Sequence, residues 1–302
     1  MVARRRFLQL GAATLASSWL APGRGRAAAG TSTPVDAAAI TTAADFAALE
    51  QACGGRLGVT LLDTALGRRH GHRQDERFPL CSTFKTVLAA TVLQQAGRAP
   101  GLLDRRVPVR EADLLTHAPV TRRHAGKDMT VRDLCRATLV TSDNTAANLL
   151  FDVVGGPAAV TAFLRGSGDG ISRSDRLEPE LNSFAAGDLR DTTTPAAMAA
   201  TLQRLVLGPV LQPASRQQLA DWLIDNETGD ACLRAGLGAR WRVGDKTGSN
   251  SEDARNDIAV LWPRGGGAPW VLTAYLQAGA ISYEQRAAVL ARVGALADAL
   301  IG

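Results

Sequence analysis

The chain has 302 residues, of which 46% are hydrophobic and 21% are charged. This composition is that of an ordinary globular protein with one large or two modest domains, and it excludes a disordered, collagen-like or coiled-coil chain. Five arginines and no acidic residue lie in residues 1–29. The 34 basic residues less these five equal the 29 acidic ones, so the formal charge of +5 comes from this segment alone. The rest of the chain is formally neutral, and we expect no nucleic-acid partner.

The first 29 residues predict an export signal that is cleaved. Residues 4–8 read Arg-Arg-Arg-Phe-Leu, an apolar run follows over residues 10–20, and three alanines end the segment at 27–29. This order resembles a twin-arginine signal, so we expect an exported, periplasmic protein. The run is shorter than the roughly 20 residues that span a bilayer, and an uncleaved N-terminal anchor is the alternative. No other apolar stretch is long enough to span, so we expect no membrane contact after cleavage.

Hydrophobic periodicity divides the remaining chain into three parts. The first predicts a helix, a buried strand and a basic strand or turn that pairs with it as a hairpin, over residues 41–52, 57–63 and 68–77. The middle part, residues 82–224, carries mostly helical signals, among them a capping box at Thr130 and a Thr194-Pro195 helix start. The last predicts three strands and a final amphipathic helix, over residues 241–245, 257–262, 270–277 and 282–301.

Strands at both ends of the chain with helices between them predict an α+β fold. We expect residues 30–80 and 226–302 to form one lobe, an antiparallel sheet flanked by the terminal helices. Residues 81–225 then form a second, helical lobe, and a site falls at the seam between the two. Residues 166–193 have no clear period, and an irregular stretch of that length in a compact domain is usually functional.

The cysteines and histidines do not form a recognisable ligand set. No pair of cysteines has C-x-x-C spacing, and the one close histidine pair, at residues 70 and 72, has no downstream cluster that would complete a metal site. We therefore predict neither a metal nor an organic cofactor.

Lysine usage singles out three positions. The chain contains 31 arginines and only three lysines, which are Lys85, Lys127 and Lys246. Arginine serves most structural roles of a positive charge but does not lose its proton in a protein, whereas lysine can. A lysine in this chain is therefore more often than usual present for chemistry, although Lys127 lies in a polar run that is typical of an exposed surface.

Ser82 and Lys85 lie one helical turn apart at the start of a predicted helix, so their side chains share a face. A serine hydroxyl is a weak nucleophile that needs a base, and a lysine with a lowered pKa can be that base. The backbone N–H of a serine at a helix N-terminus can also face a developing oxyanion. The alternative is an N-cap serine beside an exposed lysine, which the Ser-x-x-Lys spacing alone does not exclude.

Further motifs follow in a fixed order. Ser142-Asp143-Asn144 lies between two predicted helices, Glu178 and Asn182 lie in the irregular segment, and Lys246-Thr247-Gly248 lies on a predicted strand. Each could be a turn or a cap in isolation. Together with Ser82 and Lys85, they resemble the motifs of the class A serine β-lactamases, a family whose motif set overlaps with that of the penicillin-binding proteins.

The resemblance covers residues 36–301 and implies a β-lactam hydrolase that acts through an acyl-enzyme on Ser82, with penicillins and cephalosporins as substrates and antibiotic resistance as the outcome. By similarity, Lys85 is the activating partner of Ser82, and Ser142 relays a proton toward the β-lactam nitrogen. Glu178 and Asn182 hold the hydrolytic water, and whether Glu178 or Lys85 is the base for acylation stays open.

The resemblance also implies a set of substrate contacts. The substrate carboxylate is bound from the Lys-Thr-Gly strand and by Arg255, the acylamino side chain by Asn144, and the oxyanion by the backbone N–H groups of Ser82 and Ser249. His117 takes the gate position of the cleft. The residues implied in substrate binding are Asn144, Lys246, Thr247, Gly248, Ser249, Arg255 and His117.

Other positions compare with the family in detail. Arg176 and Asp191 match the pair that closes the neck of an omega-type loop, here residues 173–191. Cys135 matches one half of a common disulfide whose partner position is Ala89, so that bridge cannot form. Cys81 matches a cysteine of the carbapenem-hydrolysing branch, but Asn250 occupies the place of its partner.

Two other functions share part of the motif set. A cell-wall DD-peptidase and a penicillin-sensing domain that stays acylated both use a reactive serine, but both lack the water-activating pair Glu178 and Asn182. The sensor also requires a membrane-spanning segment. We therefore favour the hydrolase, with a small-molecule β-lactam as its partner and a monomer as its state.

Overall fold

The computed structural model describes the chain from Pro34 to Gly302, with side chains from Ala44 onward. The predicted export signal lies outside the described residues. A five-stranded antiparallel sheet occupies the centre, with the strand order β2-β1-β9-β8-β7. Its strands are β1 (Arg56–Asp63), β2 (Arg69–His72), β7 (Trp241–Ser249), β8 (Ala254–Pro263) and β9 (Trp270–Gln277). The pairing of β1 with β9 joins the two ends of the chain, as the sequence predicted.

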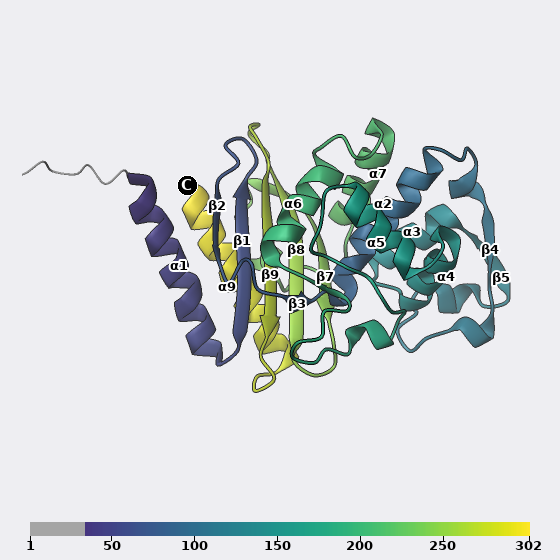
Figure 1. Cartoon of the computed structure of the whole chain (residues 1–302), viewed down its shortest axis with the longest axis horizontal. Helices are drawn as coiled ribbons and strands as arrows, with labels where there is room; N and C mark the ends of the chain where they lie inside the picture. The colour runs from purple at the N-terminus through teal and green to yellow at the C-terminus, as the bar shows by residue number, and fades with distance from the viewer. Residues whose placement is uncertain (1–33) are drawn as a thin grey trace, which may run out of the picture.

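Helices cover both faces of this sheet (Figure 1). The terminal helices α1 (Pro34–Cys53) and α9 (Tyr283–Ile301) lie together on one face, beside the short α8 (Leu233–Gly236). Helix α6 (Pro195–Val206) packs against the other face. Strands β1, β8 and β9 are therefore buried on both sides, which explains why they read as nearly continuous apolar runs rather than alternating ones.

The helical lobe extends from the second face of the sheet, to the right in Figure 1. Its helices are α2 (Phe84–Ala96), α3 (Val131–Val140), α4 (Asn144–Val154), α5 (Pro157–Gly166) and α7 (Pro213–Ile224). Two small ladders complete the described fold: β3 (Phe78–Pro79) with β6 (Thr192–Thr193), and β4 (Arg106–Val109) with β5 (Lys127–Thr130).

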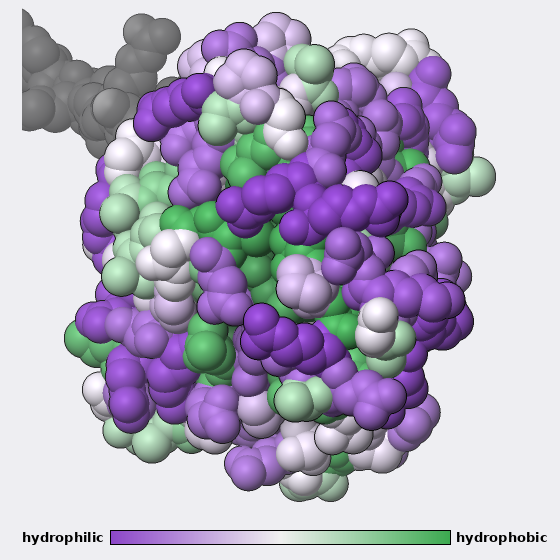
Figure 2. Space-filling view, turned by 90° about the vertical axis from the view of Figure 1, so that its right-hand side faces the viewer, coloured by the Kyte–Doolittle hydropathy of each residue, from purple (hydrophilic) through white to green (hydrophobic). Residues whose placement is uncertain are grey.

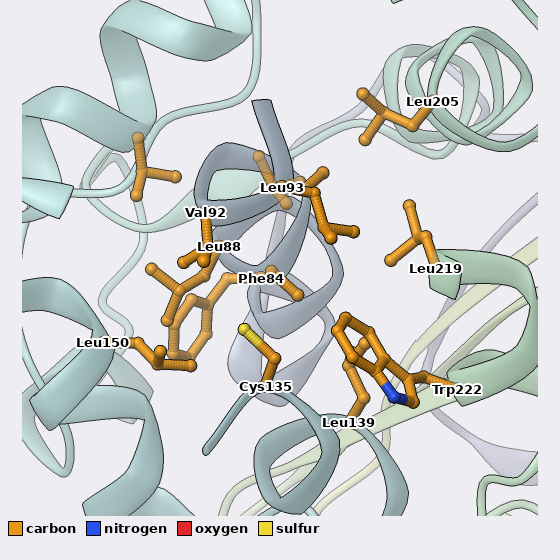
Figure 3. Packing of buried hydrophobic residues seen from close by; sticks show 14 of the residues in the cluster. Phe84, Leu88, Val92, Leu93, Cys135, Leu139, Leu150, Leu205, Leu219 and Trp222 are labelled. Atoms are coloured by element: carbon orange, nitrogen blue, oxygen red, sulfur yellow. The ribbon is translucent and has the colours of Figure 1, made fainter. Parts of the chain in front are cut away.

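Helix α2 is the centre of the helical lobe. Every residue from Phe84 to Leu93 is buried, and side chains from α3, α4, α6 and α7 surround it (Figure 3). Trp222, Leu219 and Leu205 lie on one side of α2, and Leu150 lies on the other. A helix buried on all sides resists displacement, because moving it would open cavities in the core.

The apolar core does not divide where the lobes divide. One cluster joins the helical lobe to the α6 face of the sheet, through β-strand residues such as Ile258 and Tyr275. The second cluster lies between the opposite face and helices α1, α8 and α9. The seam between the lobes is thus a groove in the surface of a continuous core.

Several predicted boundaries move. Helix α1 begins at Pro34 rather than 41, and the predicted helix at Ser82 begins as a 3-10 turn, Cys81–Thr83, before α2. Strand β7 continues past residue 245 to Ser249, because it stays paired with β8 as far as the Ser249–Arg255 pair. The irregular segment 166–193 contains only the 3-10 turn Glu180–Asn182 before it enters β6. The α+β class is confirmed.

The far end of the helical lobe is mostly hydrophilic on its surface (Figure 2). Within the described residues, no single helix is both long and apolar enough to cross a bilayer; α4 and α5 reach that length only together, with a bend of 71° between them.

Candidate active site

Ser82 lies in the 3-10 turn that precedes α2, at the seam between the lobes. The turn packs against β7, and Ser82 itself is only 9% exposed. Lys85 follows in the first turn of α2 and is completely buried. The two predicted residues therefore sit on one rigid support, with the serine at the surface of the cleft and the lysine behind it.

The Lys85 ammonium connects three other predicted residues. Its Nζ donates hydrogen bonds to Ser142 O at 2.8 Å, to Asn144 Oδ1 at 2.6 Å and to Ser142 Oγ at 3.3 Å, and it lies 3.2 Å from Glu178 Oε1. Burial lowers the pKa of Lys85, and the Glu178 carboxylate opposes this shift. A lysine held in this balance can accept a proton from a neighbouring hydroxyl far more readily than a solvated lysine.

The loop that carries Ser142 and Asn144 is fixed by the buried Asp143 between them. Asp143 caps α4 by accepting a hydrogen bond from Ala146 N at 2.9 Å. Its other oxygen accepts from the backbone of residues 120 and 121, both at 2.9 Å. Ser142 has a φ of +58°, in the left-handed region that a serine rarely adopts. The capped helix holds this conformation, which brings the side chains of Ser142 and Asn144 to Lys85.

Glu178 and Asn182 lie together in the irregular segment. Asn182 Nδ2 donates to Glu178 Oε2 at 2.6 Å, and Glu178 is only 3% exposed. Asn148, which the sequence analysis missed, holds the Glu178 backbone from both sides: its Nδ2 donates to Glu178 O at 2.8 Å, and its Oδ1 accepts from Glu178 N at 3.0 Å. The signal was present, because Asn148 lies four residues after Asn144 on the same face of α4.

The neck of loop 173–191 is closed as expected by Arg176 and Asp191. Arg176 Nε donates to Asp191 Oδ2 at 2.6 Å, and Asp191 is 3% exposed. Asp191 Oδ1 also accepts from the backbone N–H groups of Asp175 and Arg176, at 2.7 and 3.1 Å. This pair is more than a surface ion pair, because the buried Asp191 carboxylate also accepts two backbone hydrogen bonds from the facing strand of the neck.

Strand β7 carries the second lysine. Lys246 is completely buried, and its Nζ donates to Thr247 O at 3.0 Å. Burial lowers the pKa of Lys246 to about 7, and the positive charge of Lys85 acts in the same direction. Two buried carboxyls on the sheet, Asp245 and Asp257, oppose this shift. The neutral and charged forms of Lys246 are therefore close in free energy at neutral pH.

The two sheet carboxyls are themselves perturbed. Burial raises the pKa of both, and the negative charge of Asp245 raises the pKa of Asp257 well above its ordinary value. Asp245 is paired with Arg234 at 2.5 Å, so the proton of the pair belongs on Asp257. The sequence analysis did not identify this pair.

Arg255 reaches the cleft from β8. It is 5% exposed, and its guanidinium donates to Cys232 Sγ at 3.1 Å and to Thr228 O at 3.4 Å. The guanidinium carbon lies 4.4 Å from the centre of the Tyr283 ring, a cation–π contact that the sequence analysis missed. Among the described residues, no carboxylate lies within ion-pair distance of Arg255, so its charge is available to an anionic ligand.

These residues surround one cleft of about 620 Å³. Of the predicted residues, three lie behind its walls, Lys85, Glu178 and Lys246, and nine line it: Ser82, His117, Ser142, Asn144, Asn182, Thr247, Gly248, Ser249 and Arg255. His117 is exposed at the rim, and its Nε2 lies 3.0 Å from Thr141 O. The arrangement places a serine, a partly desolvated base, a buried carboxylate and an anion-binding wall around one substrate-sized space.

The cysteines do not pair in the described residues. Cys135 is buried in the core of the helical lobe, beside Phe84 and Leu139 (Figure 3), and burial raises the pKa of its thiol above its ordinary range. Cys53, Cys81 and Cys232 are also buried and unpaired. Across the part of the chain that the structure describes, no group of three His, Cys, Asp or Glu side chains could hold a metal ion.

Comparison with known proteins agrees with this geometry. A family model described as the β-lactamase enzyme family matches residues 41–300. The chain is 80% identical to β-lactamase L2 of Stenotrophomonas maltophilia over the full length of both chains. It is 47% identical to β-lactamase CTX-M-8 of Citrobacter amalonaticus, over 86% of this chain and 89% of that one.

Solved structures match equally well. A crystal structure of L2 complexed with relebactam aligns with a TM-score of 0.85 at 86% sequence identity, covering 89% of this chain and 99% of that chain. The class A β-lactamase of the last common ancestor of Gram-negative bacteria aligns with a TM-score of 0.85 at 56% identity, covering 87% of this chain and all of that chain.

Proposed function

The chain belongs to the β-lactamase enzyme family, as a class A enzyme that hydrolyses β-lactams, and from this premise we propose how its residues divide the reaction. Ser82 Oγ attacks the ring carbonyl, the C–N bond of the ring breaks, and an ester of Ser82 remains. Water then hydrolyses this ester and releases the open-ring acid. Acylation and deacylation thus make separate demands on the site.

In acylation, Lys85 supports the attack of Ser82. Its lowered pKa and its contact with Ser142 Oγ provide a path by which the serine proton reaches the ring nitrogen through Ser142. Glu178 also contacts Lys85, so it can act as the base for this step by taking a proton from the Lys85 ammonium, and the neutral lysine that remains then accepts the proton of Ser82. The backbone N–H groups of Ser82 and Ser249 stabilise the oxyanion.

Substrate binding uses the opposite wall. Lys246, Thr247 and Arg255 bind the carboxylate that penicillins and cephalosporins share, and Asn144 binds the acylamino group. Gly248 and Ser249 continue this wall along β7, and His117 borders the rim. The supporting observation is that the cleft-facing guanidinium of Arg255 has a cysteine sulfur, a carbonyl oxygen and an aromatic ring as its neighbours.

Deacylation depends on Glu178 and Asn182. The contact between these two residues is the observation that most supports hydrolysis of the acyl-enzyme. One Glu178 oxygen lies 2.6 Å from Asn182 Nδ2 and the other 3.2 Å from Lys85 Nζ, which holds a buried carboxylate beside the serine turn. A carboxylate and an amide at this position can hold and deprotonate a water that attacks the ester. A DD-peptidase or a penicillin sensor has no need of such a pair.

We propose a cellular location for the enzyme from the predicted export signal. The twin-arginine pattern, apolar run and alanine triplet of residues 1–29 support export to the periplasm, where an intercepting hydrolase confers resistance to β-lactams. We propose that the mature enzyme acts there as a monomer without membrane contact, on penicillins and cephalosporins.

Replacing Glu178 tests whether acylation and deacylation depend on different residues. Glu178→Ala removes the base for water, and general-base assistance is worth roughly 10²–10⁴-fold. We expect the variant to accumulate an adduct on Ser82 whose mass increase equals that of the added penicillin. Glu180→Ala, which removes an exposed carboxylate two residues away, is the matched control and should turn over normally.

Ser82→Ala should form no adduct. Wild-type turnover by Glu178→Ala with no trapped ester would contradict the proposal and favour the peptidase or sensor chemistry. Retained turnover by Ser82→Ala, with the circular dichroism spectrum of the wild type, would show that another group is the nucleophile.

A further inference from the structure

Three residues from three different strands meet the turn that carries Ser82. Gly248 of β7 pairs with Asn256 of β8, and Asn256 pairs with Tyr275 of β9. Residues paired across antiparallel strands point to the same face of a sheet. Gly248, Asn256 and Tyr275 therefore form one row across the sheet, which we call the cross-strand row, and it faces the helical lobe.

The first member of the row makes room for the turn. A Cβ atom on Gly248 would lie 2.9 Å from Leu80 O and 3.1 Å from Ser82 N. Both distances are shorter than ordinary contacts of a Cβ atom, and both neighbours are backbone atoms that cannot move away. The backbone of β7 and the backbone of the serine turn are thus in direct contact at this position.

The second member holds the segment that enters the turn. Asn256 is completely buried, and its Nδ2 donates to Pro79 O at 2.9 Å and to Leu80 O at 3.3 Å. Its Oδ1 has no hydrogen-bond partner in the described part of the chain. A buried amide with an unpaired oxygen costs stability, so its presence calls for an explanation other than the packing of the sheet.

The third member reaches the far side of the same turn. Tyr275 is completely buried, and its hydroxyl lies 3.3 Å from Thr83 Oγ1. Thr83 Oγ1 in turn donates to Leu80 O at 2.7 Å. The carbonyl of Leu80 thus receives hydrogen bonds from two side chains, Asn256 and Thr83, and the second of these is supported from the sheet.

The turn needs such support because its backbone is unusual. Cys81, directly before Ser82, has a φ of +44°, in the left-handed region that side chains other than glycine rarely adopt. A residue in this conformation persists only where its surroundings determine it. The direction of the Ser82 N–H and of its Oγ both follow from the conformation of the residue before it.

We propose that the cross-strand row supports the serine turn, Cys81–Thr83, and that Asn256 is a positioning residue for Ser82. Asn256 acts through the carbonyls of Pro79 and Leu80 and does not touch the substrate. It sets the position of the Ser82 N–H, which binds the oxyanion, and of Oγ, which attacks. This inference rests on the proposed role of Ser82 as the nucleophile, and it identifies Asn256 as the residue that orients Ser82.

The test distinguishes an effect on the position of Ser82 from an effect on the stability of the fold. Asn256→Leu keeps the size of the side chain but removes the donor. We expect its acylation rate constant to fall by roughly 10–10²-fold, the effect of a small misplacement of reacting groups, while the dissociation constant of the initial noncovalent penicillin complex stays the same. The affinity for a boronic acid, which forms a tetrahedral adduct on the serine, should fall by the same factor.

Thr273→Val is the matched control. Thr273 lies on β9 two residues before Tyr275, is completely buried, and donates from Oγ1 to Pro195 O at 2.9 Å. Its loss removes a buried side-chain hydrogen bond to a carbonyl on the same face of the sheet, but at α6 rather than at the serine turn. We expect a lower melting temperature with wild-type acylation and boronic acid affinity.

Two outcomes overturn the inference. One is wild-type acylation and boronic acid affinity in Asn256→Leu; the other is an equal loss of both in Thr273→Val. If Asn256→Leu does not fold, Tyr275→Phe decides: it removes only the hydroxyl at Thr83, and a severalfold loss of boronic acid affinity is expected, whereas no loss contradicts the proposal. Failure of the wild type to form an adduct on Ser82 would instead contradict the proposed function.

Discussion

The two walls of the cleft are held by different kinds of contact. The sheet wall consists of β7, which is paired with β8 along its whole length from Trp241 to Ser249, and of the serine turn that packs on it. The loop wall, residues 173–191, contains one short 3-10 turn and is held by side-chain hydrogen bonds at Arg176, Asn148 and Asp191. The sheet wall is part of the core, whereas the loop wall is attached to the core by side-chain hydrogen bonds.

This difference matches the two half-reactions. The groups proposed for attack and for carboxylate binding lie on the 3-10 turn Cys81–Thr83, α2, β7 and β8, whereas Glu178 and Asn182 lie on the loop. A region with few apolar contacts and many polar ones opens locally before the core does. Leu177 and Leu189, 41% and 48% exposed, show how little apolar anchoring the loop has. We therefore expect deacylation to be the more easily lost half of the reaction.

Lys85→Arg gives the largest expected effect and tests whether the two walls act separately. Arginine keeps the positive charge but cannot accept a proton. If Lys85 is the base of acylation, the acylation rate constant should fall by roughly 10²–10⁴-fold, measured by stopped-flow with a chromogenic cephalosporin. Lys127→Arg, at the exposed lysine, is the control and should behave as the wild type.

An unchanged acylation rate in Lys85→Arg would be equally informative. It would mean that Glu178 alone deprotonates the serine, so that the loop wall serves both half-reactions. The comparison between the walls would then describe how each is held, but not what each does.

Arg176→Ala tests the attachment of the loop. A hydrogen bond to a charged group contributes about 1.5–3 kcal/mol, and each 1.36 kcal/mol corresponds to a factor of ten in rate. We expect deacylation to fall by roughly tenfold or more, with acylation nearly unchanged, as seen in a larger steady-state fraction of acyl-enzyme. Asp191 keeps its two backbone donors in this variant, so the chain should still fold.

Arg190→Ala is the matched control on the same loop. Its ion pair with Asp188 is exposed, with Arg190 at 55% and Asp188 at 20% of their side-chain areas. Surface pairs of this kind contribute about 0–1 kcal/mol, so the variant should keep both rate constants. Equal losses of acylation and deacylation in Arg176→Ala would show that the loop and the sheet wall move as one unit.

The elements that sequence reasoning located best have strong local signals. The predicted helix start at Thr194-Pro195 is confirmed, because the Thr194 side chain caps α6 and Pro195 is its first residue. Strand β9 also matches its predicted range. Where an end depends on a partner strand, as at Ser249 opposite Arg255, the prediction stopped short because the partner is not visible in the local pattern.

The site shows the same division. Ser82, Lys85, Ser142, Glu178 and Lys246 were recognised from motifs and spacing, and their roles came from the family resemblance. The supporting residues were missed: Asn256 contacts a carbonyl 177 residues earlier, and Tyr275 contacts Thr83 across 192 residues. A buried amide or hydroxyl within an apolar strand does not reveal its partner until the sheet is assembled.

The smallest expected effect is a pH dependence that belongs to the sheet wall alone. The pKa of Lys246 lies near 7 because the residue is buried beside Lys85. Free enzyme therefore loses this charge as the pH rises, and we expect kcat/KM for a penicillin to fall by up to roughly tenfold between about pH 6 and about pH 8. A bound carboxylate favours the charged form, so the corresponding limb of kcat should lie at higher pH.

Lys246→Arg identifies the titrating group, because arginine stays charged and the limb in kcat/KM should disappear. Lys85 also has a lowered pKa and lies behind the wall of the same cleft, so a limb that survives in Lys246→Arg would belong to Lys85 instead. Arg176→Ala should keep the limb, since it changes only the loop wall. The lowered pKa of Lys246 also affects stability. In the unfolded chain Lys246 stays protonated up to a pH of about 10.5, whereas in the folded chain it loses its proton near pH 7. The unfolded state therefore binds more protons between these values, so the contribution of Lys246 to the free energy of unfolding should increase as the pH rises from about 7 toward about 10.5.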